Sequence, residues 1–536
     1  MESPVVTVTE GQVRGCQKVN LDGEYFYSFL GIPFAKPPLG DLRFKAPKPV
    51  EAWNGVRDAT RDGQPSCQWD DKNNESIGSE DCLHLGIHTK KLPSIEHSLK
   101  PVMVWIHGGG FIFGSNSSTE YGPEYLMLED IVLVSVNYRL GFLGCLNFKD
   151  TSLNVPGNAS LKDQLLALKW IQQNIHNFNG DPNNVTIFGQ SAGGASIHYL
   201  MFSPSSKGLF HRAILQSGCT FCPWSRMTEQ NVGLLFGQIV DQNIKTEKEA
   251  LEVLRKLPAN KLLEAQQKFN IKYELHLKVA PTIEKPNEAA VLTSFPQDLI
   301  AKGQYNKVPL MIGYTDMEGI LLEIYQQKET KQGLKPDYFN LDKFVHPHMA
   351  IGRNDPKREL IKEKLRKFYF TGNADEMGEK YVMATDNTYT APVVGTAKLH
   401  AKTQTEPVYL YLMSLDAGLN FLKRANGFSN IPGACHGDDL GYLFQMPLEA
   451  LNMHRGEKEL KAIRRFVKLW TNFAKYGNPT PQGNDMNITW NPVNQEEVDY
   501  LDIGEELTMR SNPEPERLKF WKEIFQLSPY TQYYLQ

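Results

Sequence analysis

The chain has 536 residues, and its 57 Lys plus Arg stand against 61 Asp plus Glu, which gives a formal net charge of −4. This balance excludes the strongly basic character of a nucleic-acid-binding protein, so a small molecule is the expected partner. With 41% hydrophobic and 22% charged residues, and without repeats or Gly/Ser-rich linkers, the chain is predicted to form one folded domain over residues 1–536.

The N-terminal residues lack the basic and apolar segments of a signal peptide, and no apolar run reaches the roughly 18 residues that span a bilayer. We therefore expect a cytoplasmic protein without a membrane span, or a secreted one if a signal has been removed. Seven cysteines leave at least one thiol unpaired. The pair Cys219-x-x-Cys222 has no second pair to complete a zinc site, so a structural role is predicted.

The predicted elements begin with a small N-terminal hairpin, in which residues 5–9 and 12–14 alternate around Glu10-Gly11. Short β-branched runs then recur, each followed by a Gly- or Asn-rich loop and often by a helical pattern. This order predicts a mostly parallel sheet with crossover helices. Its strands are expected at 102–106, 131–136, 185–188, 213–216, 309–312 and 408–412. Amphipathic helices are predicted at 160–174 and 459–476, and helical insertions over the sheet at 225–300 and 325–400.

A glycine-rich loop follows the first of these strands, in the sequence Trp105-Ile106-His107-Gly108-Gly109-Gly110-Phe111. Successive glycines let backbone N–H groups point inward without side chains in the way, which is how such a loop stabilises an oxyanion. A glycine turn kept for tight packing would give the same pattern. A phosphate loop is excluded because no Lys-Ser/Thr follows.

A second signal comes at the end of the strand at 185–188, where Gly189-Gln190-Ser191-Ala192-Gly193 leads into a helical run at 195–201. This is the G-x-S-x-G elbow between a strand and a helix, where the tight turn requires small flanking residues. It predicts Ser191 as a nucleophile at the N-terminus of a helix, whose dipole favours developing negative charge.

A base and an acid are expected later in the chain, because the residues of such a triad follow the order Ser, acid, His. His436 lies among small residues downstream of the strand at 408–412, as a loop-borne base would, whereas His107 belongs to the glycine loop. Two carboxylates, Asp316 and Glu318, follow the strand at 309–312, and spacing alone leaves both open as the group that orients the imidazole.

With these residues in place, the chain resembles the carboxylesterase/cholinesterase family over nearly all its length, with a motif set most similar to insect α-esterase-type carboxylesterases. The resemblance rests on the elbow, the glycine loop and the ordered motifs 31–35, 43–44, 79–83, 137–141, 157–159, 163–164 and 216–218. It implies an α/β-hydrolase fold, a large mostly parallel central sheet flanked by helices, with helical insertions over the active site.

The resemblance also implies roles for single residues. The triad would be Ser191, Glu318 and His436, and the oxyanion hole would consist of the amides of Gly109, Gly110 and Ala192. Other roles implied by the family are ion pairs Arg43–Glu80 and Arg139–Asp163, a supporting serine at Ser217, a Cys67–Cys82 disulfide, and a substrate pocket at Phe111 and Trp224. The Cys67–Cys82 loop is shorter than that of cholinesterases and offers no match to the Trp that faces choline there.

The implied function is hydrolysis of small to medium hydrophobic carboxylic esters through an acyl-enzyme, without metal or cofactor, in xenobiotic or dietary ester metabolism. Organophosphates are expected to inhibit by phosphorylating Ser191. Gln190 and the spacing Gly433-x-x-His436-x-x-Asp439 are similar to juvenile hormone esterases, which gives the alternative function. A non-catalytic or ligand-sequestering member of the family is the rival of another class.

Overall fold

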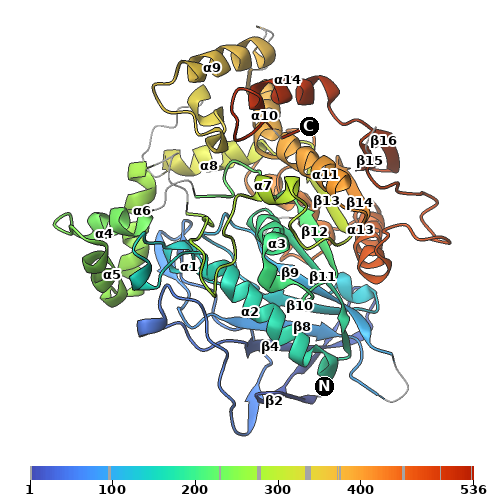
Figure 1. Cartoon of the computed structure of the whole chain (residues 1–536). Coiled ribbons are helices and arrows are strands. Elements are labelled where there is room, and N and C mark those ends of the chain that lie inside the picture. The colour runs from blue at the N-terminus through green and yellow to red at the C-terminus, as the bar shows by residue number, and fades with distance from the viewer. Residues whose placement is uncertain are drawn as a thin grey trace.

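The computed structural model describes residues 3–94, 98–227, 231–273, 279–331, 340–370, 372, 376–448, 453–494, 497–532 and 534–535. Its centre is an 11-stranded sheet (Figure 1). The strands in spatial order are β16 (Leu507–Ser511), β15 (Asp499–Ile503), β14 (Val408–Met413), β13 (Leu310–Thr315), β12 (Arg212–Gln216), β11 (Gly180–Gln190), β9 (Lys100–Ile106), β10 (Val132–Val136), β8 (His84–Thr89), β4 (Tyr25–Pro33) and β3 (Cys16–Val19).

Neighbours from β15 to β10 pair in parallel, and β16 at one edge and β8, β4 and β3 at the other pair antiparallel. The predicted mostly parallel sheet and its six strands are therefore confirmed, and so is the α/β-hydrolase fold class. The antiparallel strands β4 and β8, which lie between β10 and the edge strand β3, were not predicted. Every residue of β8 is buried, which leaves no alternation of apolar and polar residues to reveal it.

Side chains of β9 alternate between two layers of core, since successive residues of a strand point to opposite faces of the sheet. Val102 and Val104 belong to one buried cluster together with helix α2 (Ala159–Asn174) and helix α3 (Ala192–Phe202). Met103 and Trp105 belong to another, with helix α13 (Glu457–Tyr476). The sheet is thus covered on both faces, as a mostly parallel sheet requires, and the predicted helices at 160–174 and 459–476 are confirmed as α2 and α13.

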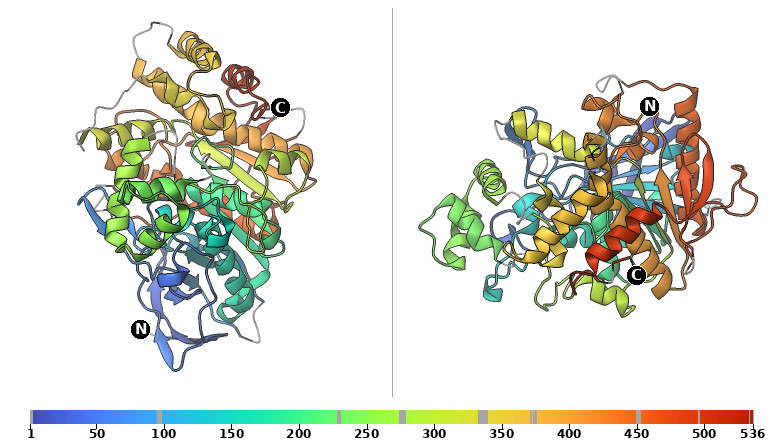
Figure 2. Two further views of the ribbon diagram at one scale, coloured as in Figure 1. Left: turned by 60° about the vertical axis from the view of Figure 1, so that its left-hand side comes forward. Right: turned by 90° about the horizontal axis from the view of Figure 1, so that it is seen from above.

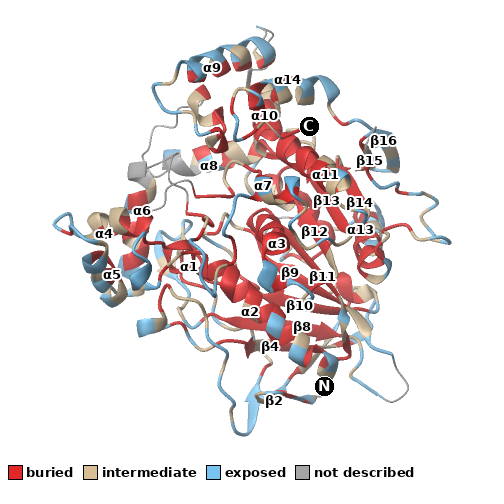
Figure 3. Cartoon of the chain, viewed as in Figure 1, coloured by how far each residue is buried: buried red, intermediate tan, exposed pale blue. Residues whose placement is uncertain are grey.

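Both predicted insertions contain helices, which lie at the outside of the sheet in Figures 1 and 2. Segments 232–256 and 356–369 are more exposed than α2, α3 and the sheet, whereas residues 380–400 are mostly buried, as Figure 3 shows. The first holds α4 (Val232–Val240), α5 (Glu247–Lys256), α6 (Ala259–Tyr273) and α7 (Pro296–Ala301). The second holds α8 (Ile320–Lys331), α9 (Pro356–Tyr369), α10 (Glu376–Thr385) and α11 (Ala391–Thr403).

The predicted N-terminal hairpin is confirmed as β1 (Val5–Val8) and β2 (Gly11–Arg14), which pair with β5 (Val56–Asp58). This small sheet lies at the opposite end of the molecule from α9 and α14 (Pro515–Phe525) (Figures 1 and 2). The shorter elements are the ribbon of β6 (Gln68–Asp70) and β7 (Glu75–Ile77), and helices α1 (Gly141–Cys145) and α12 (Phe421–Ala425). Of the described helices, none has both the length and the apolar character to cross a bilayer.

Candidate active site

The elbow between β11 and α3 holds Ser191 in a strained backbone conformation, with φ 57° and ψ −121°. Non-glycine residues adopt such angles at a cost on the order of 1–3 kcal/mol. Close packing keeps the turn in place: a Cβ on Gly193 would lie 2.0 Å from the Ile106 carbonyl oxygen, and one on Gly218 would lie 2.0 Å from the Ser191 carbonyl oxygen. The Ser191 amide donates to the Gln216 carbonyl at 2.7 Å. The sheet thus fixes the serine from below.

The glycine loop follows β9 at the same edge of the sheet. Gly109 and Gly110 have φ values of 103° and 59°, a region that favours glycine, and a Cβ on Gly109 would lie 1.9 Å from the Phe113 carbonyl oxygen. Among the described residues, no protein acceptor receives the amides of Gly109, Gly110 or Ala192. Three amide donors beside one serine are therefore available to a ligand oxygen.

His107, in the same loop, is a structural residue. Its Nδ1 donates to the Gly108 carbonyl at 2.8 Å, and its ring stacks on Tyr138 with the centroids 4.3 Å apart. Burial lowers the pKa of His107 to about 4. A neutral, fully packed imidazole holds the glycine loop in shape and is not placed to accept a proton from Ser191.

His436 meets one of the two candidate carboxylates. Its Nδ1 lies 2.5 Å from Glu318 Oε2, and the other carboxylate oxygen of Glu318 accepts the Thr315 amide at 2.9 Å. Asp316 points elsewhere: it accepts the Ala434 amide at 2.7 Å. The structure therefore brings Glu318 to the imidazole, and it uses Asp316 to hold the chain just before His436.

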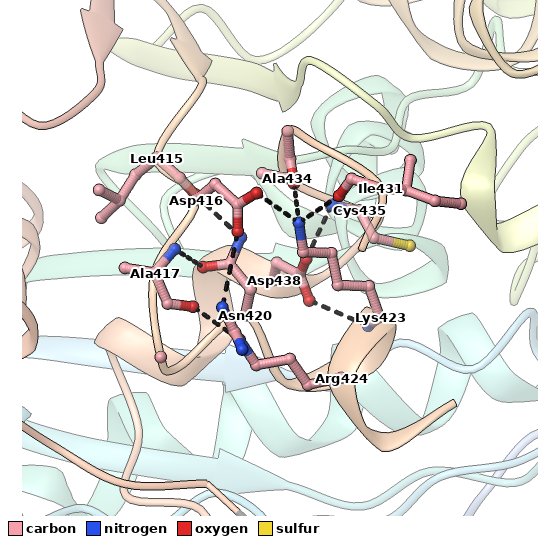
Figure 4. Close-up of polar contacts among 12 residues, drawn as sticks. Leu415, Asp416, Ala417, Asn420, Lys423, Arg424, Ile431, Ala434, Cys435 and Asp438 are labelled. Atoms are coloured by element: carbon pink, nitrogen blue, oxygen red, sulfur yellow. Dashed lines mark hydrogen bonds and ion pairs between the residues drawn. The ribbon is translucent and has the colours of Figure 1, made fainter. Parts of the chain in front are cut away.

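The loop that carries His436 is anchored from behind by buried polar groups (Figure 4). The Lys423 side chain is fully buried, and its Nζ donates to the carbonyls of Ile431 at 2.8 Å and Gly433 at 2.5 Å and pairs with Asp416 at 2.8 Å. Asp438 accepts the Cys435 amide at 2.7 Å. None of these contacts follows from a local sequence motif, so sequence reasoning missed them.

The other ring nitrogen of His436, Nε2, lies 3.0 Å from the side-chain Nε2 of Gln190, the residue before the serine. In the part of the chain that the structure describes, no hydrogen bond joins Ser191 Oγ to His436. Hydrogen bonds of catalytic groups are often long before substrate binds. In this structure the Gln190 side chain thus contacts the nitrogen that would accept the serine proton.

Ser191, Glu318 and His436 all line one cavity of about 1270 Å³. Trp224 lines it as predicted, but Phe111 does not: its ring is 1% exposed and lies against Trp224 with the centroids 6.4 Å apart, inside the core. Three lining residues that sequence reasoning missed are aromatic or apolar. They are Trp69 on β6, Ile112 after the glycine loop, and Tyr389, whose ring lies 4.7 Å from that of His436.

Tyr389 belongs to a π-helical turn, Asp386–Thr390, between α10 and α11. Such turns are rare and frequent at functional sites. Here the wider turn lets the second insertion present a tyrosine to the imidazole of His436, so the predicted placement of insertions over the site holds for this one.

The scaffold predictions have mixed outcomes. The ion pairs Arg43–Glu80 and Arg139–Asp163 are confirmed. The predicted Cys67–Cys82 disulfide is wrong for this structure, which holds both residues as free, buried thiols. The Cys82 thiol bonds to Ser66, and desolvation raises the pKa of both cysteines, to about 11 for Cys67, so neither favours the reactive thiolate.

Two further scaffold residues can be placed. Ser217 Oγ has no hydrogen-bond partner among the described residues, so its predicted support of the histidine is not seen. Cys219 and Cys222 are buried with their sulfur atoms 3.7 Å apart, in the segment that leads to Trp224. The described residues contain no cluster of His, Cys, Asp and Glu that could hold a metal.

Comparison with known proteins gives one family. The model of the Carboxylesterase family matches residues 2–521. The chain is 35% identical to juvenile hormone esterase of Tribolium castaneum over 528 residues, which is 94% of this chain and 88% of that protein. It is 33% identical to esterase FE4 of Myzus persicae, with 93% and 88% covered. The crystal structure of juvenile hormone esterase from Manduca sexta with OTFP covalently attached superposes with a TM-score of 0.86 at 32% identity, covering 98% of this chain and 100% of that one.

Proposed function

The chain belongs to the carboxylesterase family and is a carboxylic ester hydrolase, and from this premise we propose that Ser191, His436 and Glu318 are its catalytic triad. The observation that carries the proposal is the 2.5 Å contact between His436 and Glu318 in the cavity that Ser191 lines. We further propose that the amides of Gly109, Gly110 and Ala192 form the oxyanion hole, since no protein acceptor uses them within the described residues.

The mechanism follows from the donors and acceptors. Glu318 accepts the Nδ1–H of His436, which leaves the Nε2 lone pair as the base. Once Gln190 yields that nitrogen, Ser191 Oγ attacks the ester carbonyl carbon and its proton passes to Nε2. The three amides stabilise the negative oxygen of the tetrahedral intermediate, and each such donor contributes about 3 kcal/mol.

Collapse of the intermediate breaks the bond to the alcohol, which leaves with the proton from Nε2. Water then attacks the acyl-enzyme, gives its proton to the same nitrogen, and the acid departs as Ser191 takes the proton back. Glu318 stabilises the imidazolium in both halves without itself accepting the proton. The steps need only water and an ester, so they suit a cytoplasmic or a secreted protein equally.

The proposed substrates are small to medium hydrophobic esters of xenobiotic or dietary origin. Trp69, Trp224 and Tyr389 give the cavity aromatic walls, which favour apolar groups beside the scissile bond. An organophosphate should phosphorylate Ser191, because its phosphoryl oxygen fits the same three amides as the carbonyl oxygen of an ester.

A second candidate is a juvenile hormone esterase. It is favoured by Gln190 in the elbow and by three juvenile hormone esterases among the similar proteins, at 35%, 33% and 32% identity. Esterase FE4, at 33%, is equally similar, so identity alone does not separate the candidates. A comparison of kcat/KM for juvenile hormone III and for p-nitrophenyl butyrate separates them.

The test of the triad is Ser191→Ala, for which we expect loss of steady hydrolysis of p-nitrophenyl butyrate by at least about 10⁴-fold. Ser203→Ala is the matched control, since Ser203 is buried near the end of α3 and its hydroxyl has no partner among the described residues. Paraoxon should add one diethylphosphoryl group at Ser191 in the parent protein and none in Ser191→Ala. Full turnover by Ser191→Ala, or an adduct elsewhere with loss of activity, would refute the proposal.

A further inference from the structure

One buried arginine differs from the others. Among the described residues, the buried arginines are Arg43, Arg139, Arg226 and Arg358. Three of them pair with carboxylates, Arg43 with Glu80, Arg139 with Asp163 and Arg358 with Asp342. Arg226 is 8% exposed, yet in the described part of the chain no carboxylate or carbonyl accepts a hydrogen bond from its guanidinium, and its Nη1 is fully buried.

An aromatic ring lies beside this guanidinium, whose central carbon is 4.8 Å from the centroid of Phe295. A cation over an aromatic ring gains about 0.5–2 kcal/mol, less than the several kcal/mol that a buried, unpaired charge loses in desolvation. A buried arginine without an anion is therefore an unfinished ion pair, and a ligand can complete it.

A second unpaired donor lines the same cavity as Arg226. His348 is 2% exposed, and its Nε2 is buried without a partner among the described residues. Its Nδ1 lies 3.1 Å from the Tyr534 hydroxyl. When that hydroxyl donates to Nδ1, the neutral ring carries its proton on Nε2 and offers it as a donor. Burial, together with the charge of Arg226, holds the pKa of His348 well below its usual range, which favours the neutral ring.

Arg226 and His348 both line the cavity that holds Ser191 and His436. Arg226 follows the cavity-lining Trp224 by two residues, and Lys343 lines the same cavity. The lining carboxylate nearest in sequence to His348 is Asp342, and it is already bound by Arg358 and Lys362. The protein supplies donors here and leaves the acceptor to the ligand.

We propose that Arg226 and His348 form an anion-binding subsite of the active-site cavity, which receives the ionised carboxylate of an ester that carries a second, free carboxyl group away from the scissile bond. The guanidinium can donate two parallel N–H groups to a carboxylate, and the imidazole can donate a third. The apolar and aromatic walls then hold the chain between the two polar ends. This inference rests on the proposed function, because it names a substrate class for the same site.

The experiment compares matched esters. The first series consists of mono-p-nitrophenyl esters of dicarboxylic acids. The second consists of p-nitrophenyl esters of monocarboxylic acids with equal chain length. The third carries the carboxylate on the alcohol part, as ω-carboxyalkyl acetates. We expect one chain length at which the parent protein prefers the carboxylate ester in kcat/KM. Arg226→Met should reduce that preference by about 10- to 100-fold. The change in kcat/KM of the same variant for the neutral ester of equal chain length is the reference against which this loss is measured.

Further variants separate binding from folding. Arg226→Lys keeps the charge without the fork and should retain part of the preference. His348→Gln supplies an N–H and should retain more of it than His348→Leu. Equal preference in the parent protein and Arg226→Met at every chain length would overturn the subsite. If no ester is turned over at all, the proposed function fails, and the thermal shift of Ser191→Ala with monomethyl dodecanedioate, set against methyl dodecanoate, still decides the subsite. No larger shift with the carboxylate would refute it.

Discussion

The nucleophile and the base of this site are held in different ways. Ser191 lies on a turn whose shape is set by backbone contacts at van der Waals distance, where glycines at 193 and 218 leave no room for a methyl group. His436 lies on a loop whose shape is set by polar side chains, with Lys423, Asp316 and Asp438 donating to or accepting from its backbone. One region is fixed by steric exclusion and the other by long-range hydrogen bonds.

The difference concerns how each region fails. A steric turn tolerates no added atom but has few charges to disturb, so it should respond to volume and hardly to pH. A polar anchor tolerates small changes in volume but depends on charge and protonation, because a buried donor without its acceptor costs about 1–3 kcal/mol. Substitutions that act on one property at a time can therefore test the comparison.

The largest effect is expected at the elbow. In Gly193→Ala the new Cβ would lie 2.0 Å from the Ile106 carbonyl oxygen, so strand β9 or helix α3 must move. We expect loss of soluble protein, or a fall of the unfolding temperature with no site that paraoxon can titrate. Gly352→Ala is the control, because its Cβ would meet no atom within 4 Å and its φ is an ordinary one. An active, stable Gly193→Ala would contradict steric control of the elbow.

The same contrast explains how much of the site could be predicted from the sequence. The elbow and the glycine loop are local: small residues at fixed spacing after a strand specify them, so Ser191, Gly109, Gly110 and Ala192 could be assigned as candidates. The choice between Asp316 and Glu318 is not local, since both follow the same strand, and only a resemblance to a family favoured Glu318. In the structure their side chains serve different partners, His436 and the Ala434 amide.

Other features lay beyond sequence reasoning for related reasons. The anchor Lys423 sits in a short helix with no motif, and its acceptors are backbone carbonyls eight and ten residues further on. The family resemblance implied a pocket role for Phe111, but its backbone has φ 64° and the side chain packs into the core. Trp69 lines the cavity from the Cys67–Cys82 loop, in which no tryptophan was expected to face the substrate. The positions of these side chains depend on the left-handed backbone at single residues and on the course of the loops, and neither can be predicted from composition.

The second largest effect is expected at the polar anchor. Lys423→Met fits an unbranched chain into the same space but leaves two carbonyls without their donor, and it leaves Asp416 with its longer pair to Arg424, at 3.7 Å. Breaking a buried ion pair in this way destabilises by about 3–5 kcal/mol. We expect kcat for p-nitrophenyl butyrate to fall by at least about tenfold while KM changes little, since His436 loses its position and the cavity walls do not.

Lys458→Met is the matched control for this variant. Its Nζ also bonds a backbone carbonyl, that of Asp416, and an acidic side chain, Glu505, but it is 43% exposed. Exposed pairs contribute about 0–1 kcal/mol, so both kcat and the unfolding free energy should stay near those of the parent. Similar kinetics for the two variants would show that the buried anchor does not position the base.

A smaller effect is expected where the two regions meet, at the contact between Gln190 and His436 Nε2. Glu at this position would place a carboxylate beside the imidazolium that forms during the reaction and stabilise it. The acid limb of kcat/KM against pH should therefore move to higher pH by about one unit, with lower activity near pH 6. Gln190→Met, of similar volume and without charge, should leave the limb in place. If the acid limb does not move in Gln190→Glu, the side chain at position 190 does not contact the His436 imidazole in solution.

The smallest effect isolates protonation in the anchor. Burial raises the pKa of Asp316 to about 6, against about 3.9 in an unfolded chain. Between these values the folded protein keeps a proton that the unfolded chain has lost, so this group's contribution to stability falls as pH rises from about 4 to 6 and is constant above. Asp316→Asn keeps an acceptor for the Ala434 amide and cannot ionise.

The unfolding temperature of Asp316→Asn, relative to that of the parent protein, should therefore rise between pH 4 and 6. The expected rise is about 1–2 °C for a chain of this size. The exposed Asp41, whose side chain is 92% accessible, gives the control Asp41→Asn, for which the difference from the parent should not depend on pH. A curve for Asp316→Asn that runs parallel to that of the parent would mean that the His436 loop is held by the shape of its anchor and not by its charge state. The base would then be fixed sterically, like the nucleophile, and the contrast between the two regions would be one of chain distance alone.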